Sequence, residues 1–169
     1  MTSTATDSAR FETGYMDTAW ADPSALIAEA RDALRGVKYD TMVGTGMSGA
    51  IIVPVLARAL RKKFLIVRKD EDLKSSHASR PWLGVLGRRW LFVDDFISLG
   101  GTFARVRDAV DAAVEHINQE QKRRRTNACS NEDCDYCKPV APEGEPFTTT
   151  LVGSYMYERQ GFKSWADES

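Results

Sequence analysis

The stretch WLFVDDFISLGGT, residues 90–102, decides the fold class of this chain. Its apolar start, Trp90–Val93, predicts a buried strand that ends in Asp94 and Asp95, and its Gly-Gly turn opens a predicted helix. Such a turn lets backbone N–H groups point into one cavity, and a helix N-terminus adds partial positive charge there. The turn therefore predicts a phosphate site, to which Ser98 and Thr102 can add hydroxyl groups. The two acids suit a neutral diol or a hydrated metal ion better than they suit the phosphate.

The sequence on either side of this stretch alternates predicted strands and helices. A glycine-rich turn, GTGMSG at residues 44–49, follows one strand, and a long charged loop over residues 68–87 follows the next. The alternation predicts an α/β fold, a mostly parallel sheet flanked by helices, whose ligands bind at the carboxyl ends of the strands. The predicted elements are helices over Pro23–Arg35, from Ala50 to about Leu60 and from Thr102 to about Glu120, and strands over Tyr39–Val43, Phe64–Val67, Trp90–Val93 and Phe147–Tyr157.

Length and composition narrow the class of protein. The chain has 169 residues, a length typical of one domain, and its three cysteines favour a reducing, cytoplasmic setting. Its longest apolar run, Ala50–Ala57, is too short to cross a membrane, and its first residues lack the pattern of a secretory signal. We expect no membrane partner.

The charge is unevenly distributed along the chain. Residues 58–90 contain ten basic and three acidic residues, whereas the whole chain has a net charge of −1. A basic segment between acidic flanks predicts a polyanionic partner, the alternative being a solvated Lys/Arg surface. The pI of about 6.1 argues against a nucleic-acid-binding domain, which is usually basic overall.

Three of these segments resemble motifs of one enzyme family. Residues 90–102 resemble the phosphoribosyl pyrophosphate (PRPP) motif of the type I phosphoribosyltransferases. GTGMSG resembles the pyrophosphate loop of that family, and IVRKDEDLKSSH, residues 66–77, resembles the flexible loop of its orotate branch. The motifs occur in the family's order. The resemblance implies Mg²⁺-dependent transfer of 5-phosphoribose from PRPP to a nucleobase or related acceptor, with release of pyrophosphate.

The resemblance also implies roles for individual residues. Asp94 and Asp95 would hold the ribose hydroxyls, and Mg²⁺ would be bound by the pyrophosphate and the ribose diol. The catalytic set would be Asp95, Ser98, Lys74 and His77, the last two closing over the site. The PRPP-binding set would be Asp94, Asp95, Phe96, Ile97, Ser98, Leu99, Gly100, Gly101 and Thr102, and the pyrophosphate-binding set Thr45, Gly46, Met47, Ser48, Arg68 and Lys69.

The chain departs from the family pattern in four places. Leu99 stands where many members have Thr, and Ser98 where purine enzymes often have Asp. The segment DEDL, residues 70–73, lengthens the flexible loop, and the chain is short for an orotate enzyme. These departures leave a second function open, a PRPP-binding regulator that contacts protein or nucleic acid through residues 118–138.

A receiver domain also carries paired acids after a strand. In a receiver the pair follows the first strand, whereas here it follows the third predicted strand and precedes Gly-Gly, which argues against that class.

The resemblance further implies a small hood, built from the chain termini, that recognises the acceptor base. Aromatic candidates to stack on the base are Phe11, Tyr15, Trp20, Phe162 and Trp165. The family also suggests a homodimer.

Residues 118–146 break the alternation and predict an insertion within the single domain. Its cysteines, Cys129, Cys134 and Cys137, have part of the spacing of a structural zinc site. The fourth ligand would be His116, an acid or a partner chain. The alternative is three free thiols in an exposed loop.

Overall fold

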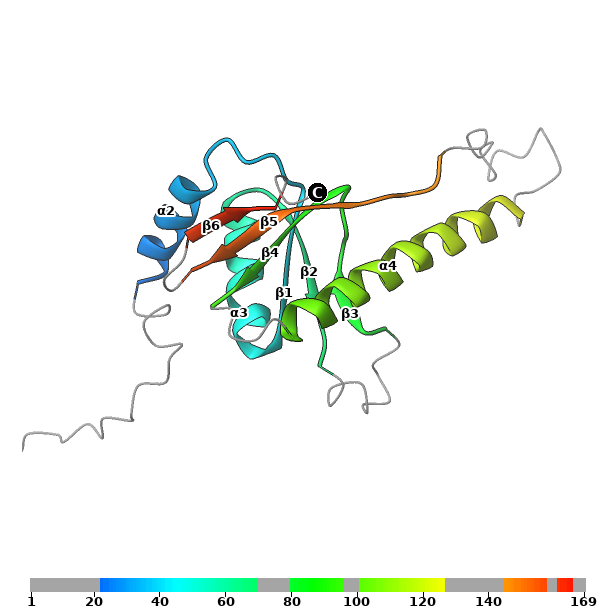
Figure 1. The fold of residues 1–169 in the computed structure, drawn as a ribbon, viewed down its shortest axis with the longest axis horizontal. Helices are drawn as coiled ribbons and strands as arrows, with labels where there is room; N and C mark the ends of the chain where they lie inside the picture. The colour runs from blue at the N-terminus through cyan, green and yellow to red at the C-terminus, as the bar shows by residue number, and fades with distance from the viewer. Residues whose placement is uncertain (1–21, 70–79, 96–100, 127–144, 158–160, 166–169) are drawn as a thin grey trace, which may run out of the picture.

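The computed structural model describes residues 22–69, 80–95, 101–126, 145–157 and 161–165. Four strands of its six-stranded sheet run parallel, and the two edge strands, β3 and β6, run antiparallel to their neighbours, in the order β3-β2-β1-β4-β5-β6 (Figure 1). The predicted α/β class, a mostly parallel sheet flanked by helices, is confirmed. The elements are α2 (Pro23–Ala33), β1 (Thr41–Thr45), α3 (Gly46–Ala59), β2 (Lys63–Val67), β3 (Trp82–Gly84), β4 (Arg89–Asp94), α4 (Gly101–Thr126), β5 (Thr150–Met156) and β6 (Gly161–Ser164).

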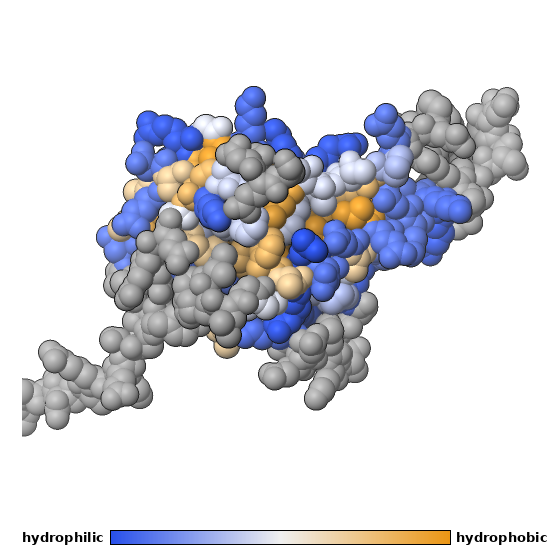
Figure 2. All heavy atoms as spheres, in the orientation of Figure 1, coloured by the Kyte–Doolittle hydropathy of each residue, from blue (hydrophilic) through white to orange (hydrophobic). Residues whose placement is uncertain are grey.

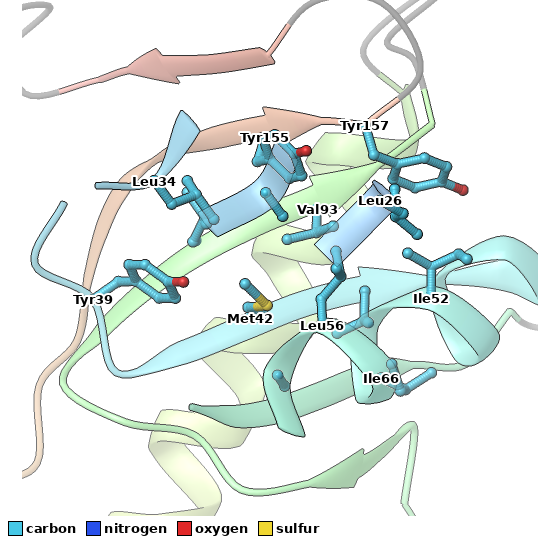
Figure 3. Close-up of a cluster of buried hydrophobic side chains, with 14 residues drawn as sticks. Leu26, Leu34, Tyr39, Met42, Ile52, Leu56, Ile66, Val93, Tyr155 and Tyr157 are labelled. Carbon is cyan, nitrogen blue, oxygen red and sulfur yellow. The ribbon is translucent and has the colours of Figure 1, made fainter. Parts of the chain in front are cut away.

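Successive residues of the central strands are buried on opposite faces of the sheet, because side chains alternate along a strand. Met42 of β1 packs under α2 and α3 (Figure 3). Its neighbour Val43 packs on the opposite face, under α4. Leu91 and Phe92 of β4 divide in the same way between the two clusters. Burial on both faces explains why these strands are apolar runs in the sequence rather than alternating patterns.

Helix α2 begins as its sequence predicts. The carboxylate of Asp22 accepts hydrogen bonds from the backbone N–H groups of Ser24 and Ala25, both at 3.0 Å, and Pro23 occupies the first turn. This side chain satisfies two of the N–H groups that a helix leaves without intrahelical partners. Among the described residues, no helix combines the length and apolarity needed to cross a membrane.

The structure corrects several predicted boundaries. The loop predicted over residues 68–87 contains the edge strand β3, and residues 161–164, expected in the hood, form the other edge strand, β6. Helix α3 starts at Gly46, inside the predicted turn. Short edge strands escape prediction because three or four residues carry too little pattern to detect.

Helix α4 continues past its predicted end, to Thr126, and so takes in the first part of the expected insertion. The segment that extends it is rich in Gln, Glu, Lys and Arg, which are strong helix formers. Arg123 and Glu120 form an i,i+3 ion pair of 3.1 Å there. The outer part of this helix extends away from the sheet and is largely hydrophilic (Figures 1 and 2).

A polar contact joins α4 to the segment before β5, where the chain comes back to the sheet. The side-chain amide of Asn118 donates to the carbonyl of Phe147 at 3.0 Å and accepts from its backbone N–H at 2.7 Å. The pair thus holds together the two ends of the segment between residues 118 and 147.

This contact yields a stability prediction. Asn118→Ala removes both hydrogen bonds at a half-buried position, so we expect the free energy of unfolding in urea to fall by about 1–2 kcal/mol. Gln119→Ala is the matched control, because its side chain bonds only to Glu115 on the exposed helix surface. We expect that control to cost under about 0.5 kcal/mol. Equal losses in the two variants would contradict a structural role for the Asn118 contact.

Candidate functional site

The turn between β1 and α3 has no loop residues. Strand β1 ends at Thr45 and helix α3 begins at Gly46, whose φ of +70° lies in the left-handed region. The backbone of Gly49 packs directly on that of Gly44: a Cβ added at Gly44 would lie 3.3 Å from Gly49 Cα and 2.6 Å from Val53 Cγ2. The glycines of GTGMSG therefore seat the first turn of α3 against the end of β1. Sequence reasoning predicted a tight turn here but not this contact between backbones.

The hydroxyl of Thr45, a member of the predicted pyrophosphate set, is engaged within the sheet. It is only 3% exposed, and its hydroxyl donates to the carbonyl of Val67, the last residue of β2, at 2.7 Å. The side chain thus ties β1 to β2 and does not cap α3. Since the first N–H groups of a helix lack intrahelical partners, this N-terminus retains donors for an anion.

The other members of the predicted pyrophosphate set lie close to that N-terminus. Because Thr45 is in register with Val67, Arg68 and Lys69 leave β2 beside Gly46. Lys69 crosses the turn so closely that a Cβ added at Gly46 would lie 3.1 Å from its Cε. Met47 is 73% exposed. Ser48, by contrast, is buried.

The paired acids stand at the end of the adjacent strand. Asp94 ends β4, Asp95 follows it, and each is only 7% exposed. The backbone N–H of Asp95 donates to Asp94 Oδ1 at 3.0 Å, and the N–H of Tyr157 donates to the carbonyl of Asp94 at 3.2 Å. The end of β4 is therefore held both locally and by the chain leaving β5.

Burial makes Asp94 an unusual carboxyl group. Burial first, and the charge of Asp95 second, raise the pKa of Asp94 from 3.8 to about 7, while the charge of Lys69 opposes the shift. Two adjacent, nearly buried carboxylates favour partners that supply positive charge or hydroxyl donors. A ribose diol and a hydrated divalent cation are both such partners.

The chemistry of this donor set fits Mg²⁺. Mg²⁺ prefers hard oxygen ligands and binds through one or two carboxylates, with water and substrate phosphates completing its coordination. No group of three or more His, Cys, Asp or Glu that could hold a metal occurs among the described residues.

The remaining predicted residues divide into two sets. Gly101 and Thr102 begin α4 and are exposed, so a second helix N-terminus follows the acids. The predictions for Phe96, Ile97, Ser98, Leu99 and Gly100, for Lys74 and His77, for Phe11, Tyr15 and Trp20, and for Cys129, Cys134 and Cys137 lie outside the described residues.

Three other candidates lie in the described part of the chain and are used for packing. Trp165 stacks on Phe103, with ring centroids 5.1 Å apart and planes 18° apart, and its Nε1 donates to Ser154 Oγ at 3.2 Å. Phe162 packs against the core and over Gly153. These contacts explain both C-terminal aromatic residues without a bound base. His116, the possible zinc ligand, packs edge-on against Trp82, with centroids 5.9 Å apart.

Comparison with known proteins gives structural matches. No protein-family model matches the chain. No curated protein matches it either. It is similar to the adenine phosphoribosyltransferases of Thermoanaerobacter pseudethanolicus (26% identity, 57% of this chain and 61% of that one, TM-score 0.43) and of Saccharomyces cerevisiae, whose structure contains adenine (27%, 55% and 63%, 0.41). It is also similar to the orotate phosphoribosyltransferase of Aeropyrum pernix (16%, 58% and 58%, 0.46).

These three proteins are all phosphoribosyltransferases. The chain spans less than two thirds of each of them, and the superpositions are partial.

The hydroxyl of Thr45 gives the first prediction for the site. Thr45→Val removes the bond to Val67 and leaves a buried carbonyl without its donor, which loosens the position of Arg68 and Lys69 beside the turn. We expect the affinity for inorganic pyrophosphate, measured by titration calorimetry, to fall about tenfold. Thr45→Ser keeps the hydroxyl and should bind nearly as well as the unmodified protein. Equal binding by the Val variant would show that this bond does not position the site.

The raised pKa of Asp94 gives a prediction about pH. Because this pKa is about 7 in the folded protein and near 3.8 when unfolded, the folded state holds the proton more strongly, and the free energy of unfolding falls as pH rises from about 4 to 7. Asp94→Asn removes this penalty. In ligand-free protein with EDTA, we expect it to stabilise the fold by on the order of 2 kcal/mol at pH 8 and hardly at all at pH 4.

The control for this pH series is Asp108→Asn, which changes an exposed acid on α4. It should show no such difference between pH 4 and pH 8. If Asp94→Asn is equally neutral at both pH values, the buried acid pair carries no electrostatic penalty.

Proposed function

We propose that this protein is a phosphoribosyltransferase, which transfers 5-phosphoribose from PRPP to a nucleobase-like acceptor and releases pyrophosphate. One observation carries the proposal. A nearly buried pair of acids, Asp94 and Asp95, ends the strand beside the uncapped N-terminus of α3, and Lys69 lies across the turn between them. This places acceptors for a diol next to donors for a polyanion, the two parts that PRPP presents.

The acid pair would bind the ribose. Carboxylates buried this deeply gain from hydroxyl donors, so Asp94 and Asp95 would accept hydrogen bonds from the ribose O2 and O3 hydroxyls. This orients C1 of the sugar toward the anion site at the start of α3. Holding the sugar in one orientation removes much of the entropic barrier to its reaction with the acceptor.

The N-terminus of α3 would bind the leaving group. As the bond between C1 and the pyrophosphate oxygen breaks, negative charge accumulates on the pyrophosphate, and the acceptor nitrogen forms the new bond to C1 and loses its proton. The first N–H groups of α3 and the cations of Arg68 and Lys69 would stabilise that charge as it develops. Mg²⁺, bound between the acid pair and the substrate, would supply further neutralisation.

Other parts of the proposal rest on the motif resemblance. Lys74 and His77 would close over the site and exclude water, and Ser98, Gly101 and Thr102 would hold the 5′-phosphate. We also propose that the protein acts as a homodimer in the cytoplasm. The acceptor base and the zinc site at Cys129, Cys134 and Cys137 remain predictions.

A variant without the acid charges tests the ribose site. Asp94→Asn with Asp95→Asn removes two charge-assisted hydrogen bonds of about 1.5–3 kcal/mol each, so we expect PRPP affinity to fall by at least about 100-fold. The measurement is the rise in melting temperature with PRPP and Mg²⁺, since a ligand that binds only the native state stabilises it. Asp108→Asn with Asp111→Asn makes the same charge change on α4 and should bind normally.

Turnover is measured separately, as pyrophosphate released from PRPP with orotate, uracil, adenine, guanine and hypoxanthine. Release with one base supports the enzyme. PRPP binding without release from any base would support the regulator instead. If PRPP does not raise the melting temperature of the unmodified protein, the proposed function is refuted.

A further inference from the structure

The fold divides the cations of the basic segment, residues 58–90, between the two ends of the parallel strands. Arg68 and Lys69 lie at the carboxyl ends of the strands, beside the acid pair, whereas Lys63 begins β2 and Arg89 begins β4. Asp94 is the sixth residue of β4, so about 17 Å of extended strand separates it from Arg89. A substrate bound at the acid pair therefore leaves the second group of cations without an anion.

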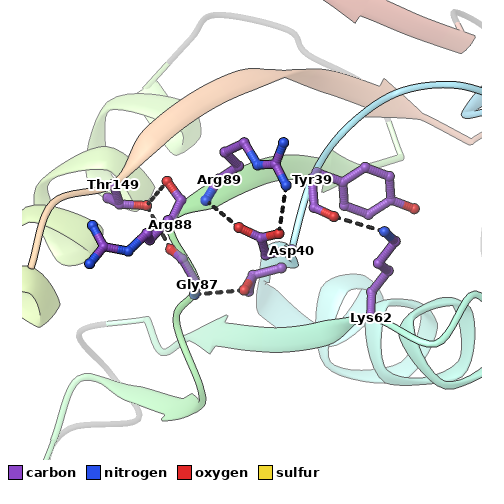
Figure 4. Close-up of polar contacts among 8 residues, drawn as sticks. Tyr39, Asp40, Lys62, Gly87, Arg88, Arg89 and Thr149 are labelled. Carbon is purple, nitrogen blue, oxygen red and sulfur yellow. Dashed lines mark hydrogen bonds and ion pairs between the residues drawn. The ribbon is translucent and has the colours of Figure 1, made fainter.

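The second group of cations lies at the amino ends of the strands, and we call this end of the sheet the basal edge. Backbone hydrogen bonds join it across three strands. The N–H of Asp40 donates to the carbonyl of Arg89 at 2.8 Å, and the N–H of Lys63 donates to the carbonyl of Asp40 at 2.9 Å. The carbonyl of Arg88 accepts from the N–H of Thr150 at 2.8 Å, which extends the edge to β5. The hydroxyl of Thr149 also donates to the carbonyls of Gly87 and Arg88, at 2.8 and 3.1 Å (Figure 4). The basal edge consists of the cations Lys38, Arg61, Lys62, Lys63, Arg88 and Arg89 around the acid Asp40.

Asp40 interacts with two of these cations, Arg89 and Lys62, and forms an ion pair with Arg89. Asp40 pairs with Arg89, from Oδ1 to Nη2, at 3.1 Å, and a side-chain hydrogen bond from Arg89 lowers the pKa of Asp40. Lys38, Arg61 and Lys63 are exposed and form no ion pair with any described residue. The edge therefore carries a concentrated positive charge in a chain whose net charge is −1.

Helix capping does not explain this charge. A cation near the end of α3 interacts favourably with the helix dipole, which accounts for Arg61 and Lys62. Lys38, Lys63, Arg88 and Arg89 instead stand in or just before strands, which have only small net dipoles. Arg61 is also strained: its φ of 54° is the left-handed conformation that glycine adopts at little cost.

The surface around these cations favours one class of partner. Protein interfaces concentrate aromatic and apolar residues at their centre and are depleted of Lys. Of the three large hydrophobic side chains exposed in the described part of the chain, only Val85 lies beside the basal edge, where its N–H bonds to Phe64. The aromatic rings there are already engaged: Lys62 lies over Tyr39 at 4.5 Å and Arg88 over Phe147 at 5.8 Å, while Phe64 and Trp90 pack in the core.

We propose that the basal edge binds the phosphodiester backbone of a nucleic acid, independently of the acid pair on the opposite edge. Closely spaced cations without an apolar centre match a chain of phosphates, and covered rings leave no surface on which bases could stack. Recognition is therefore by charge and not by base sequence. The pI of the whole chain argues against such a partner only as an average, because the fold concentrates basic residues at one edge.

The test is fluorescence anisotropy with a labelled 20-nucleotide RNA of mixed sequence, and the DNA of the same sequence, between 50 and 200 mM KCl. Four phosphate contacts on a single strand give a slope of log affinity against log salt of about −3, which is a loss of about 50-fold over this range. Lys63→Glu with Arg88→Glu should weaken binding at least tenfold. The control, Arg105→Glu with Arg107→Glu, makes the same charge change on an exposed part of α4 and should stay within twofold.

Inorganic pyrophosphate separates this proposal from the proposed function. At saturating concentration it should not displace the RNA, because it occupies the opposite edge. The proposal would be overturned if pyrophosphate displaced the RNA, if the two Glu variant pairs lost equal affinity, or if no RNA bound at 50 mM KCl. Binding of polyglutamate as tightly as RNA would also overturn it, and would identify an acidic protein as the partner. Lys63→Gln with Arg88→Gln controls for a folding defect, and its melting temperature should be unchanged. Its RNA affinity should lie between those of the unmodified protein and the Lys63→Glu with Arg88→Glu variant. Tighter binding of the RNA than of the DNA would identify RNA as the partner.

Discussion

The parallel pairing of β1 with both β2 and β4 is the constraint on which the rest of the structure depends. All five residues of β1, Thr41–Thr45, pair with β2, and the first three also pair with β4. Because the three strands run in one direction and nearly in register, their carboxyl ends meet at one edge of the sheet and their amino ends at the other. Residues far apart in the sequence thereby become neighbours: the turn at Gly46, the cations after Val67 and the acids after Val93.

That strand pairing also explains why backbone atoms, and not side chains, meet at the turn between β1 and α3. Helix α3 must turn back immediately after β1 to cover the sheet, and the contact of Gly44 with Gly49 allows it to do so without intervening loop residues. The hydroxyl of Thr45, which a free helix would use as a cap, is directed to β2 instead. Within the described part of the chain, the N-cap residue of α3 thus makes no side-chain hydrogen bond to the helix N–H groups at the proposed anion site.

The acid pair, unlike the turn between β1 and α3, lowers the stability of the ligand-free protein. Burying two adjacent carboxylates disfavours their charged forms, so burial and the neighbouring charge of Asp95 raise the pKa of Asp94. Folded proteins tolerate such groups where a ligand offsets the penalty, which is why perturbed carboxyls concentrate at functional sites. The well-packed residues beneath the pair, Val93 and Phe92, supply the stability that offsets it.

The sequence by itself determined the class of fold and predicted where the candidate site residues lie along the chain. Apolar runs ending in Asp94–Asp95 and in GTGMSG are local signals, because strands buried on both faces must be apolar and tight turns must contain glycine. Tertiary structure decided what depends on distant residues: that the Thr45 hydroxyl bonds to Val67, that Trp165 stacks on Phe103, that β3 and β6 join the sheet, and that one basic segment divides between two edges. Those outcomes follow from strand register and direction, which no single segment of the sequence encodes.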